Sequence, residues 1–345
     1  MTVKRCLLVL GIVAGLSTAA FVAREIEGPG LPMTVAAETL FRTLDAKQQK
    51  KAAFAFDDKE RFRWYFTPQQ DLKKRTALRN GVPLAEMTDR QKELTRLLLR
   101  TGTSESGYLK ATVIMSLEAI LADLEKNGRM VRDPSWYFLT FFGTPSKTGK
   151  WGWRLEGHHL SLNFTVEAGK VVSATPFFLG ANPAVVKGGA RKGTEALPEA
   201  VKPFRDLIAL LDDEQKKVAR QPKAFPEIEE AKPRASVGDP VGLAAAKMTD
   251  KQKAALWQLI EGYAVRMPIA VAAHELAAIK DAGLDKVTFA YGGGDGTAGK
   301  PYTYRIQGPT FVIEFLNEQA DSAGNPANHI HSVYRSLRND FGLTS

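Results

Sequence analysis

Four of the chain's five histidines fall in two close pairs, and these residues have the clearest capacity for chemistry. His158 and His159 are adjacent, whereas His329 and His331 are separated by one residue. On a β-strand, residues two apart share a face with their Cβ atoms roughly 7 Å apart, so the second pair can reach one ion. The spacing permits a metal site, because neutral imidazoles are common ligands of transition metals, but alone it is weak evidence for one. Histidines spaced in this way are also often hydrogen-bonded structural residues.

A carboxylate completes the predicted ligand set. We predict that His159, His329 and His331 bind a divalent transition metal ion, with Glu314 as a fourth ligand or as a general base. Three nitrogen donors and one oxygen donor suit zinc, copper, iron or manganese. Cys6 is the only cysteine, so thiolate ligation, a cysteine nucleophile and an internal disulfide are all excluded from the mature chain.

Two arginines are candidates for orienting an anionic substrate. The guanidinium groups of Arg154 and Arg335 could each bind a carboxylate or phosphate through two parallel hydrogen bonds. For Arg154, a structural salt bridge with Glu156 or another nearby acid is the favoured interpretation and anion binding is the alternative. Ser161 lacks the Gly-x-Ser-x-Gly setting of a hydrolase nucleophile, which argues against a serine hydrolase.

The element expected to position His159 is a strand over residues 151–165, because polar and apolar residues alternate along it. The predicted polar face holds His159, Ser161, Asn163 and Thr165, and the mostly apolar face holds His158, Leu160, Leu162 and Phe164. His158 is therefore expected in the core or in a supporting role. Strands are also predicted over 135–142, 170–179, 287–291 and 328–335.

The order of motifs in the first half of the chain recurs in the second half. Residues 44–50 resemble 211–217, the capping-box helix start at 87–94 resembles 248–256, and the stretch 151–165 resembles 302–315. We predict an α+β fold made by internal duplication, in which each copy has helices followed by a three-stranded antiparallel meander. The two copies would pack as one pseudo-twofold domain, with repeats at 24–186 and 201–345 and a loop at 187–200.

The duplicated frame predicts one site at the junction of the copies, because the copies differ where ligands are needed. Arg154 matches Arg305, whereas His159 falls on Thr310 and Asn163 falls on Glu314. The proline-rich segment 222–240 and the loop 187–199 are read as connections, with a role as lids as the alternative. The glycine-rich stretch 292–299 joins two strands and is predicted to be a hairpin turn.

The N-terminus has the charge, apolar core and small residues of a signal peptide, predicted over residues 1–23. Export to the periplasm or exterior is expected, without stable membrane insertion after cleavage; an uncleaved N-terminal anchor is the alternative. The formal net charge of +9 is scattered, which favours a solvated surface over a polyanion site. No nucleic-acid-binding motif is present, so the partner expected is a small-molecule or anionic envelope substrate.

Several longer motifs resemble one known family. They are the stretch 151–163, Phe142–Ser146, Thr175–Pro183, Tyr304–Thr310 and Asn328–Arg335. Together they are similar to exported bacterial proteins labelled domain of unknown function 3500, and the resemblance spans nearly the whole mature chain. It implies export and the paired histidines but no activity. The family pattern has an aspartate where Leu316 stands, so Glu314 is the better carboxylate candidate.

Two functions fit these observations. The first is an exported metal-dependent hydrolase or oxidoreductase. The second is a non-catalytic envelope ligand-binding protein, with a structural histidine network and with Trp136, Trp151 and Trp153 lining a ligand groove.

Overall fold

The computed structural model describes residues 28–343, so the predicted signal peptide lies outside the described residues. The first group of strands is β1 (Ala53–Phe54), β4 (Val82–Pro83), β5 (Phe138–Phe142), β6 (Lys150–Gly157), β7 (Leu160–Glu167), β8 (Lys170–Ser173) and β9 (Phe177–Ala181). The second group is β10 (Arg220–Gln221), β11 (Leu243–Ala244), β12 (Thr288–Gly293), β13 (Tyr302–Gln307), β14 (Phe311–Gln319) and β15 (His329–Ser336). A separate small hairpin contains β2 (Gln70–Asp71) and β3 (Thr76–Ala77).

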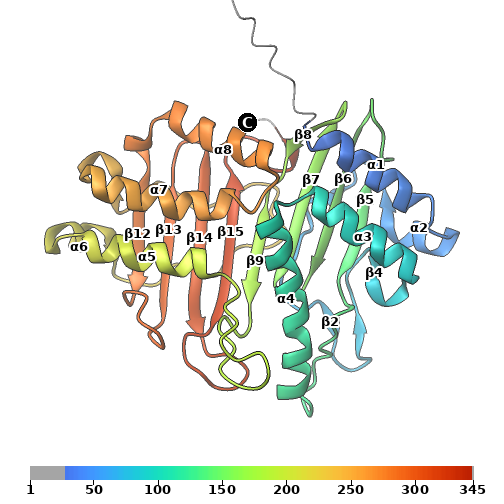
Figure 1. The fold of residues 1–345 in the computed structure, drawn as a ribbon, viewed down its shortest axis with the longest axis horizontal. Helices are drawn as coiled ribbons and strands as arrows, with labels where there is room; N and C mark the ends of the chain where they lie inside the picture. The colour runs from blue at the N-terminus through green and yellow to red at the C-terminus, as the bar shows by residue number, and fades with distance from the viewer. Residues whose placement is uncertain (1–27, 344–345) are drawn as a thin grey trace, which may run out of the picture.

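These two groups form one 13-stranded sheet with the path β1-β5-β6-β7-β9-β15-β14-β13-β12-β10. Strand β4 also pairs with β5, β8 with β7 and β11 with β12. The path is antiparallel except at its two ends, where β1 is parallel to β5 and β10 is parallel to β12. The two groups meet where β9 pairs with β15, at the middle of the sheet (Figure 1).

The helices cover one face of this sheet, so the α+β prediction is confirmed (Figure 1). The α-helices are α1 (Gly30–Phe41), α2 (Ala46–Ala52), α3 (Asp89–Thr101), α4 (Glu105–Leu124), α5 (Pro198–Leu210), α6 (Asp213–Ala219), α7 (Asp250–Ala264) and α8 (Ile269–Ala282). Short 3-10 helices span Lys59–Phe62, Leu84–Glu86, Ala245–Lys247, Leu284–Lys286 and Asp340–Gly342. Within residues 28–343, no helix combines the length and the hydropathy needed to cross a bilayer.

Capping boxes fix the starts of four helices, and two of these were predicted from the sequence. The pairs are Asp45 with Gln48, Thr88 with Gln91, Asp212 with Gln215, and Thr249 with Gln252. The glutamines also bond each other, Gln48 to Gln91 at 2.8 and 3.0 Å and Gln215 to Gln252 at 2.7 and 3.0 Å. Each bond ties two successive helices of its half together.

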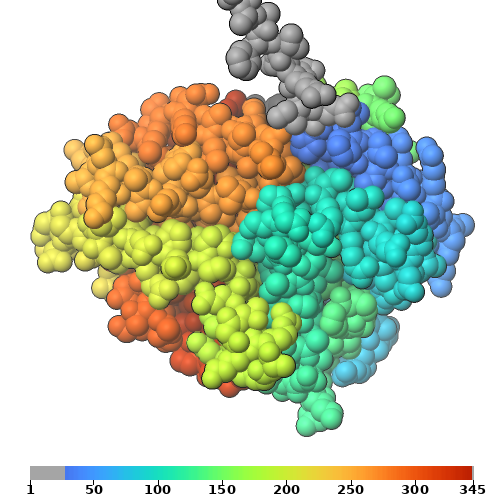
Figure 2. Space-filling view, in the orientation of Figure 1, coloured from blue at the N-terminus to red at the C-terminus, as the bar shows by residue number. Residues whose placement is uncertain are grey.

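The main apolar core fills the space between the helices and the sheet. Trp151 and Trp153 of β6 belong to it, with exposed fractions of 0% and 1%, and Trp153 stacks on Phe164 at 4.5 Å between ring centroids. The prediction that Trp151 and Trp153 line a ligand groove is therefore wrong. The alternation of β6 turns both indoles under the helices, which hide most of the sheet from this side (Figure 2).

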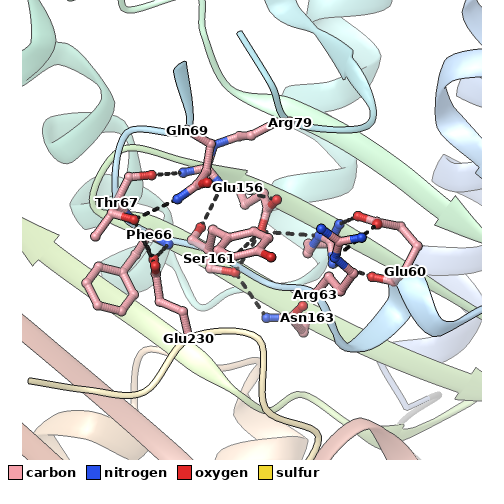
Figure 3. Close-up of polar contacts among 12 residues, drawn as sticks. Glu60, Arg63, Phe66, Thr67, Gln69, Arg79, Glu156, Ser161, Asn163 and Glu230 are labelled. Carbon is pink, nitrogen blue, oxygen red and sulfur yellow. Dashed lines mark hydrogen bonds and ion pairs between the residues drawn. The ribbon is translucent and has the colours of Figure 1, made fainter. Parts of the chain in front are cut away.

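A second, smaller apolar cluster lies on the opposite face of the sheet. Its members are Trp64, Phe66, Phe178, Ile228, Leu316, Val333 and Phe341. The segment 222–240 runs along this face and is held by hydrogen bonds. For example, Glu230 accepts from the backbone N–H groups of Phe66 and Thr67 at 2.6 and 2.7 Å (Figure 3).

The predicted single strand over 151–165 is wrong, because β6 and β7 form a hairpin that reverses at His158 and His159. Gly157 pairs with Leu160 across the turn, and His159 has a left-handed backbone with φ of 62°. A Cβ at position 157 would lie 2.4 Å from the ring of Tyr137, which explains the glycine before the turn. Within β7 the predicted alternation holds, but the two histidines lie outside it.

The predicted third strand over 170–179 is also divided. Residues 174–176 separate β8 from β9. Both strands pair with β7, at different parts of its length, and β9 also pairs with β15. Pro176 has no N–H to continue a strand ladder, which accounts for the interruption. This division places β9 at the centre of the sheet, beside the paired histidines.

Candidate metal centre

Three histidines from distant parts of the chain converge, as the sequence predicted. The Nε2 atom of His159 lies 2.8 Å from Nε2 of His329 and 3.2 Å from Nε2 of His331. One ligand atom from each of the three residues lies within 4.8 Å of the other two. His159 and His331 are buried and His329 is partly exposed, so the group is internal and is most accessible at His329.

Strand β9 connects the elements that carry these imidazoles. Gly180 of β9 pairs with His331, and its N–H donates to the backbone oxygen of His159 at 2.8 Å. A Cβ at Gly180 would lie 2.7 Å from the backbone oxygen of Ile330 and 3.1 Å from Cδ2 of His159. The absence of a side chain at position 180 therefore lets the His159 ring cross β9 and reach His331.

A β-bulge positions the other two histidines. The register of β14 against β15 shifts between Leu316 and Gln319, opposite His329 and His331. Within the bulge, Oδ1 of Asn317 accepts a hydrogen bond from the backbone N–H of His329 at 3.1 Å. The bulge thus replaces one ladder bond with a side-chain bond, as is frequent where a strand must aim a functional residue.

Burial keeps the first two imidazoles in the form that binds metal. Burial, followed by the charges of neighbouring histidines, holds the pKa of His159 well below its usual value. Burial and then the charge of His331 lower the pKa of His329 to about 3. Both rings are therefore neutral near pH 7, so neither must release a proton when a metal ion binds.

The third imidazole is oriented by a carboxylate from the segment 222–240. The Nδ1–H of His331 donates to Oε2 of Glu227 at 2.9 Å, so in the neutral ring Nε2 carries the lone pair and faces the other histidines. Burial would raise the pKa of Glu227, but the hydrogen bond and charge of His331 outweigh it and lower this pKa. Glu227 is thus an anionic acceptor that selects the tautomer of His331.

His158 supports the group from outside, in agreement with the supporting role expected for it. Its ring lies on that of His159, with 3.7 Å between centroids, and its Nδ1 contacts Glu118 of α4 and Nη1 of Arg132, the latter at 3.1 Å. Burial lowers the pKa of His158, although the Glu118 carboxylate opposes this shift. These contacts hold His158 in place, and His158 directly precedes His159 in the turn.

Two of the three nitrogen spacings are close to those around a tetrahedral ion. Bonds of 2.0–2.1 Å at tetrahedral angles place two ligand nitrogens about 3.3 Å apart. The contacts of 2.8 and 3.2 Å made by His159 are shorter than this by up to about half an ångström, whereas the three ligand atoms lie within 4.8 Å of one another, so His329 and His331 would have to approach each other for one ion to bind both. In the described part of the chain the group contains three possible ligand residues, so a fourth position would be open to a small molecule.

The structure does not bring Glu314 to this group. Its Oε1 accepts from Nη2 of Arg305 at 2.9 Å, across the β13–β14 pair. Burial raises the pKa of Glu314, and the Arg305 charge partly offsets this rise. Glu314 lies on β14 before the bulge, opposite Val333, and its contacts are those of a buried ion pair.

The two arginines proposed to orient a substrate are also engaged elsewhere. Nε of Arg335 donates to Asp340 at 2.7 Å, and its Nη2 donates to the backbone oxygen of Lys232 at 2.9 Å. Arg154 is fully buried and lies 2.8 Å from Glu60 and 3.2 Å from Glu156, whose carboxylates can be followed in Figure 3. Arg154 therefore forms the structural salt bridge that the sequence favoured for it.

A family model for proteins of unknown function, DUF3500, matches residues 28–343. The chain belongs to the DUF3500 family. The match covers all of the described DUF3500 fold, including both histidine pairs and the segment that carries Glu227. The comparisons with curated proteins and with solved structures returned no match. Family membership thus supports the resemblance seen in the sequence without supplying an activity.

Sequence reasoning missed the three residues that support the imidazoles of this DUF3500 site. Glu227, Glu118 and Arg132 contact His331 or His158 from segments about 26 to 104 residues away. No local pattern marks them. The only hint was that 222–240 forms an excursion long enough to return to the sheet.

Proposed function

We propose that this protein binds one divalent transition metal ion through Nε2 of His159, His329 and His331. The observation that carries the proposal is the convergence of these three nitrogens, because Nε2 of His159 lies 2.8 Å from that of His329 and 3.2 Å from that of His331. In neutral His331, the bond from Nδ1 to Glu227 leaves a lone pair on Nε2. Nε2 of His159 carries either one N–H or one lone pair, so it cannot make a well-directed hydrogen bond to both neighbours, whereas a cation between the nitrogens would accept a lone pair from all three.

The donor set favours catalysis over a purely structural ion. Three neutral imidazoles with an open fourth position are typical of catalytic zinc sites, and similar sets serve copper and iron. The bound ion would supply Lewis-acid or redox chemistry, and the partly exposed edge at His329 would admit a small substrate. We therefore propose a metal-dependent hydrolase or oxidoreductase acting on a small molecule or an anionic envelope component.

We also propose that the chain arose by internal duplication, with repeats at 24–186 and 201–345. Supporting it are the matched sheet order on either side of β9 and β15, and the matched glutamine pairs of the two helix layers. In this arrangement His159 occupies the β6–β7 turn, while the equivalent turn between β13 and β14 has Thr310. Export, with removal of residues 1–23, is part of the same proposal and rests on the N-terminal sequence.

Metal content tests the central proposal. The mature chain would be incubated with zinc, copper, iron or manganese, dialysed, and analysed by inductively coupled plasma mass spectrometry. We expect about one equivalent of one metal in the wild type and a loss of most of it in His329→Ala/His331→Ala. The matched control is His274→Ala, which removes an exposed histidine on α8 and should retain the metal.

The competing function is a ligand-binding protein with a structural histidine network. The 2.8 Å contact of His159 with His329 is the observation that favours this alternative, because it fits an ordinary hydrogen bond. Equal metal content in the wild type and the double variant would support the network and remove the metal proposal.

A further inference from the structure

A cavity lies on the helix-covered face of the sheet, on the opposite side of β15 from the histidine side chains. Its volume is about 400 Å³, within the range of small-molecule sites. The loop after β9, the first turns of α5, the β12–β13 loop and the loop before β15 enclose it. Ile330 lines the cavity, whereas the neighbouring His329 and His331 project from the other face of β15. In Figure 2 the yellow-green loop after β9 lies beside the orange-red strand segments at the lower edge.

The lining of this cavity combines apolar side chains with the hydroxyl of Tyr302 and the buried amides of Asn317 and Asn328. Leu197, Ile330 and Tyr302 have exposed fractions of 1%, 2% and 2%. Within residues 28–343 the Tyr302 hydroxyl completes no hydrogen bond, although the Asn317 side chain approaches it. A buried hydroxyl without a partner is costly, and a ligand atom in the cavity would satisfy it.

The ring of Tyr302 is held in place by its neighbours. It stacks on Phe204 of α5 at 4.8 Å and on Phe315 of β14 at 5.3 Å between centroids. The hydroxyl therefore has a fixed position before any ligand arrives, which lowers the entropy cost of binding.

The rim of the cavity carries two cations. Lys187 and Arg205 both line it, and neither forms an ion pair with another described residue. The stem of Arg205 packs against the β12–β13 loop at Gly296, where a Cβ would lie 2.5 Å from Cγ of Arg205. Glu195 is the one acid among the lining residues, so the rim has an excess of positive charge.

We propose that this cavity binds a small organic anion. Its carboxylate or phosphate lies at the rim beside Arg205 and Lys187, its apolar part lies on Leu197 and Ile330, and a polar atom bonds the Tyr302 hydroxyl. The proposal does not depend on the metal centre, because no residue of the three-histidine group lines the cavity.

Three probe molecules test this site by isothermal titration calorimetry on the full mature chain. Benzoate and phenyl phosphate carry the two anionic groups on the same ring, and benzamide is the neutral counterpart of benzoate. We expect at least one anion to bind with a Kd below about 10 mM and more tightly than benzamide. Which anion binds better separates a carboxylate ligand from a phosphate ligand.

Two variants locate the binding. Arg205→Gln removes a charge from the exposed rim and should weaken the anion about tenfold, whereas Lys202→Gln on the same helix lies outside the cavity and should leave Kd unchanged. Tyr302→Phe, checked for folding by circular dichroism, should weaken binding by about threefold or more. Absence of binding by both anions, or equal Kd values in Arg205→Gln and the wild type, would overturn the proposal. Metal content is expected to be unchanged in these variants, so this test and the metal test fail separately.

Discussion

Replacing Glu227 by glutamine tests how the third imidazole is oriented. The carboxylate accepts from Nδ1–H of His331 at 2.9 Å, and a glutamine can offer only a neutral oxygen or a competing N–H. Partners of metal-bound histidines contribute about 10- to 100-fold to metal affinity. Because the Glu227 side chain is 44% exposed, water can replace part of the bond, and we expect the lower end, about tenfold or 1.4 kcal/mol.

The assay is competition for zinc between the protein and a chromogenic chelator at constant pH and ionic strength. Glu318→Gln is the matched control, because Glu318 is an exposed acid near Glu227 that makes no hydrogen bond to a histidine in the described structure. It removes the same charge and should change affinity by less than about threefold at physiological salt. Equal losses in the two variants would show that only the net charge matters, and unchanged affinity in Glu227→Gln would refute the orienting role.

Three further predictions concern the stability of the fold and its zinc affinity. In the metal-free protein the free energy of unfolding should fall as pH drops below about 6.5, because the unfolded chain protonates His159 and His329 while the folded chain does not. Urea titrations should show a fall of up to about 1.4 kcal/mol per pH unit for each histidine, and His329→Asn should remove the contribution of His329. Gly180→Ala should lower the free energy of unfolding by about 1–3 kcal/mol in urea titrations and weaken zinc binding, because the new Cβ would press on the backbone oxygen of Ile330 and on the His159 ring. Zinc affinity equal to that of the wild type would contradict this. Arg154→Ala should cost about 3 kcal/mol by thermal unfolding, since it leaves Glu60 and Glu156 buried with one cation fewer, and a change below about 1 kcal/mol would contradict the salt-bridge role.

The sequence revealed the histidine group because its main features are local. The one-residue spacing of His329 and His331 is enough to place both on one face of a strand, and the capping boxes at Thr88 and Thr249 depend on residues three apart. His159 reaches His329 and His331 once the β6–β7 hairpin lies near β15. Such features are determined by backbone periodicity, which can be read along the chain.

The remaining features depend on contacts between distant segments. Strand periodicity alone did not reveal the turn at His158 and His159, because alternation of polar and apolar residues continues on both sides of it. Glu314 was predicted to lie with the histidines, but the register of β13 and β14 places it opposite Arg305, with which it forms an ion pair. Glu227 was not predicted, since nothing near it in the sequence shows where its loop returns to the sheet.

Anomalous diffraction at the zinc edge, from crystals grown with zinc, tests the metal centre most directly. We predict one ion bound about 2.0–2.1 Å from Nε2 of each of His159, His329 and His331, with a solvent molecule or substrate group at the fourth position. The contradicting result is a map in which the histidines remain hydrogen-bonded to one another and no anomalous peak lies within bonding distance of all three.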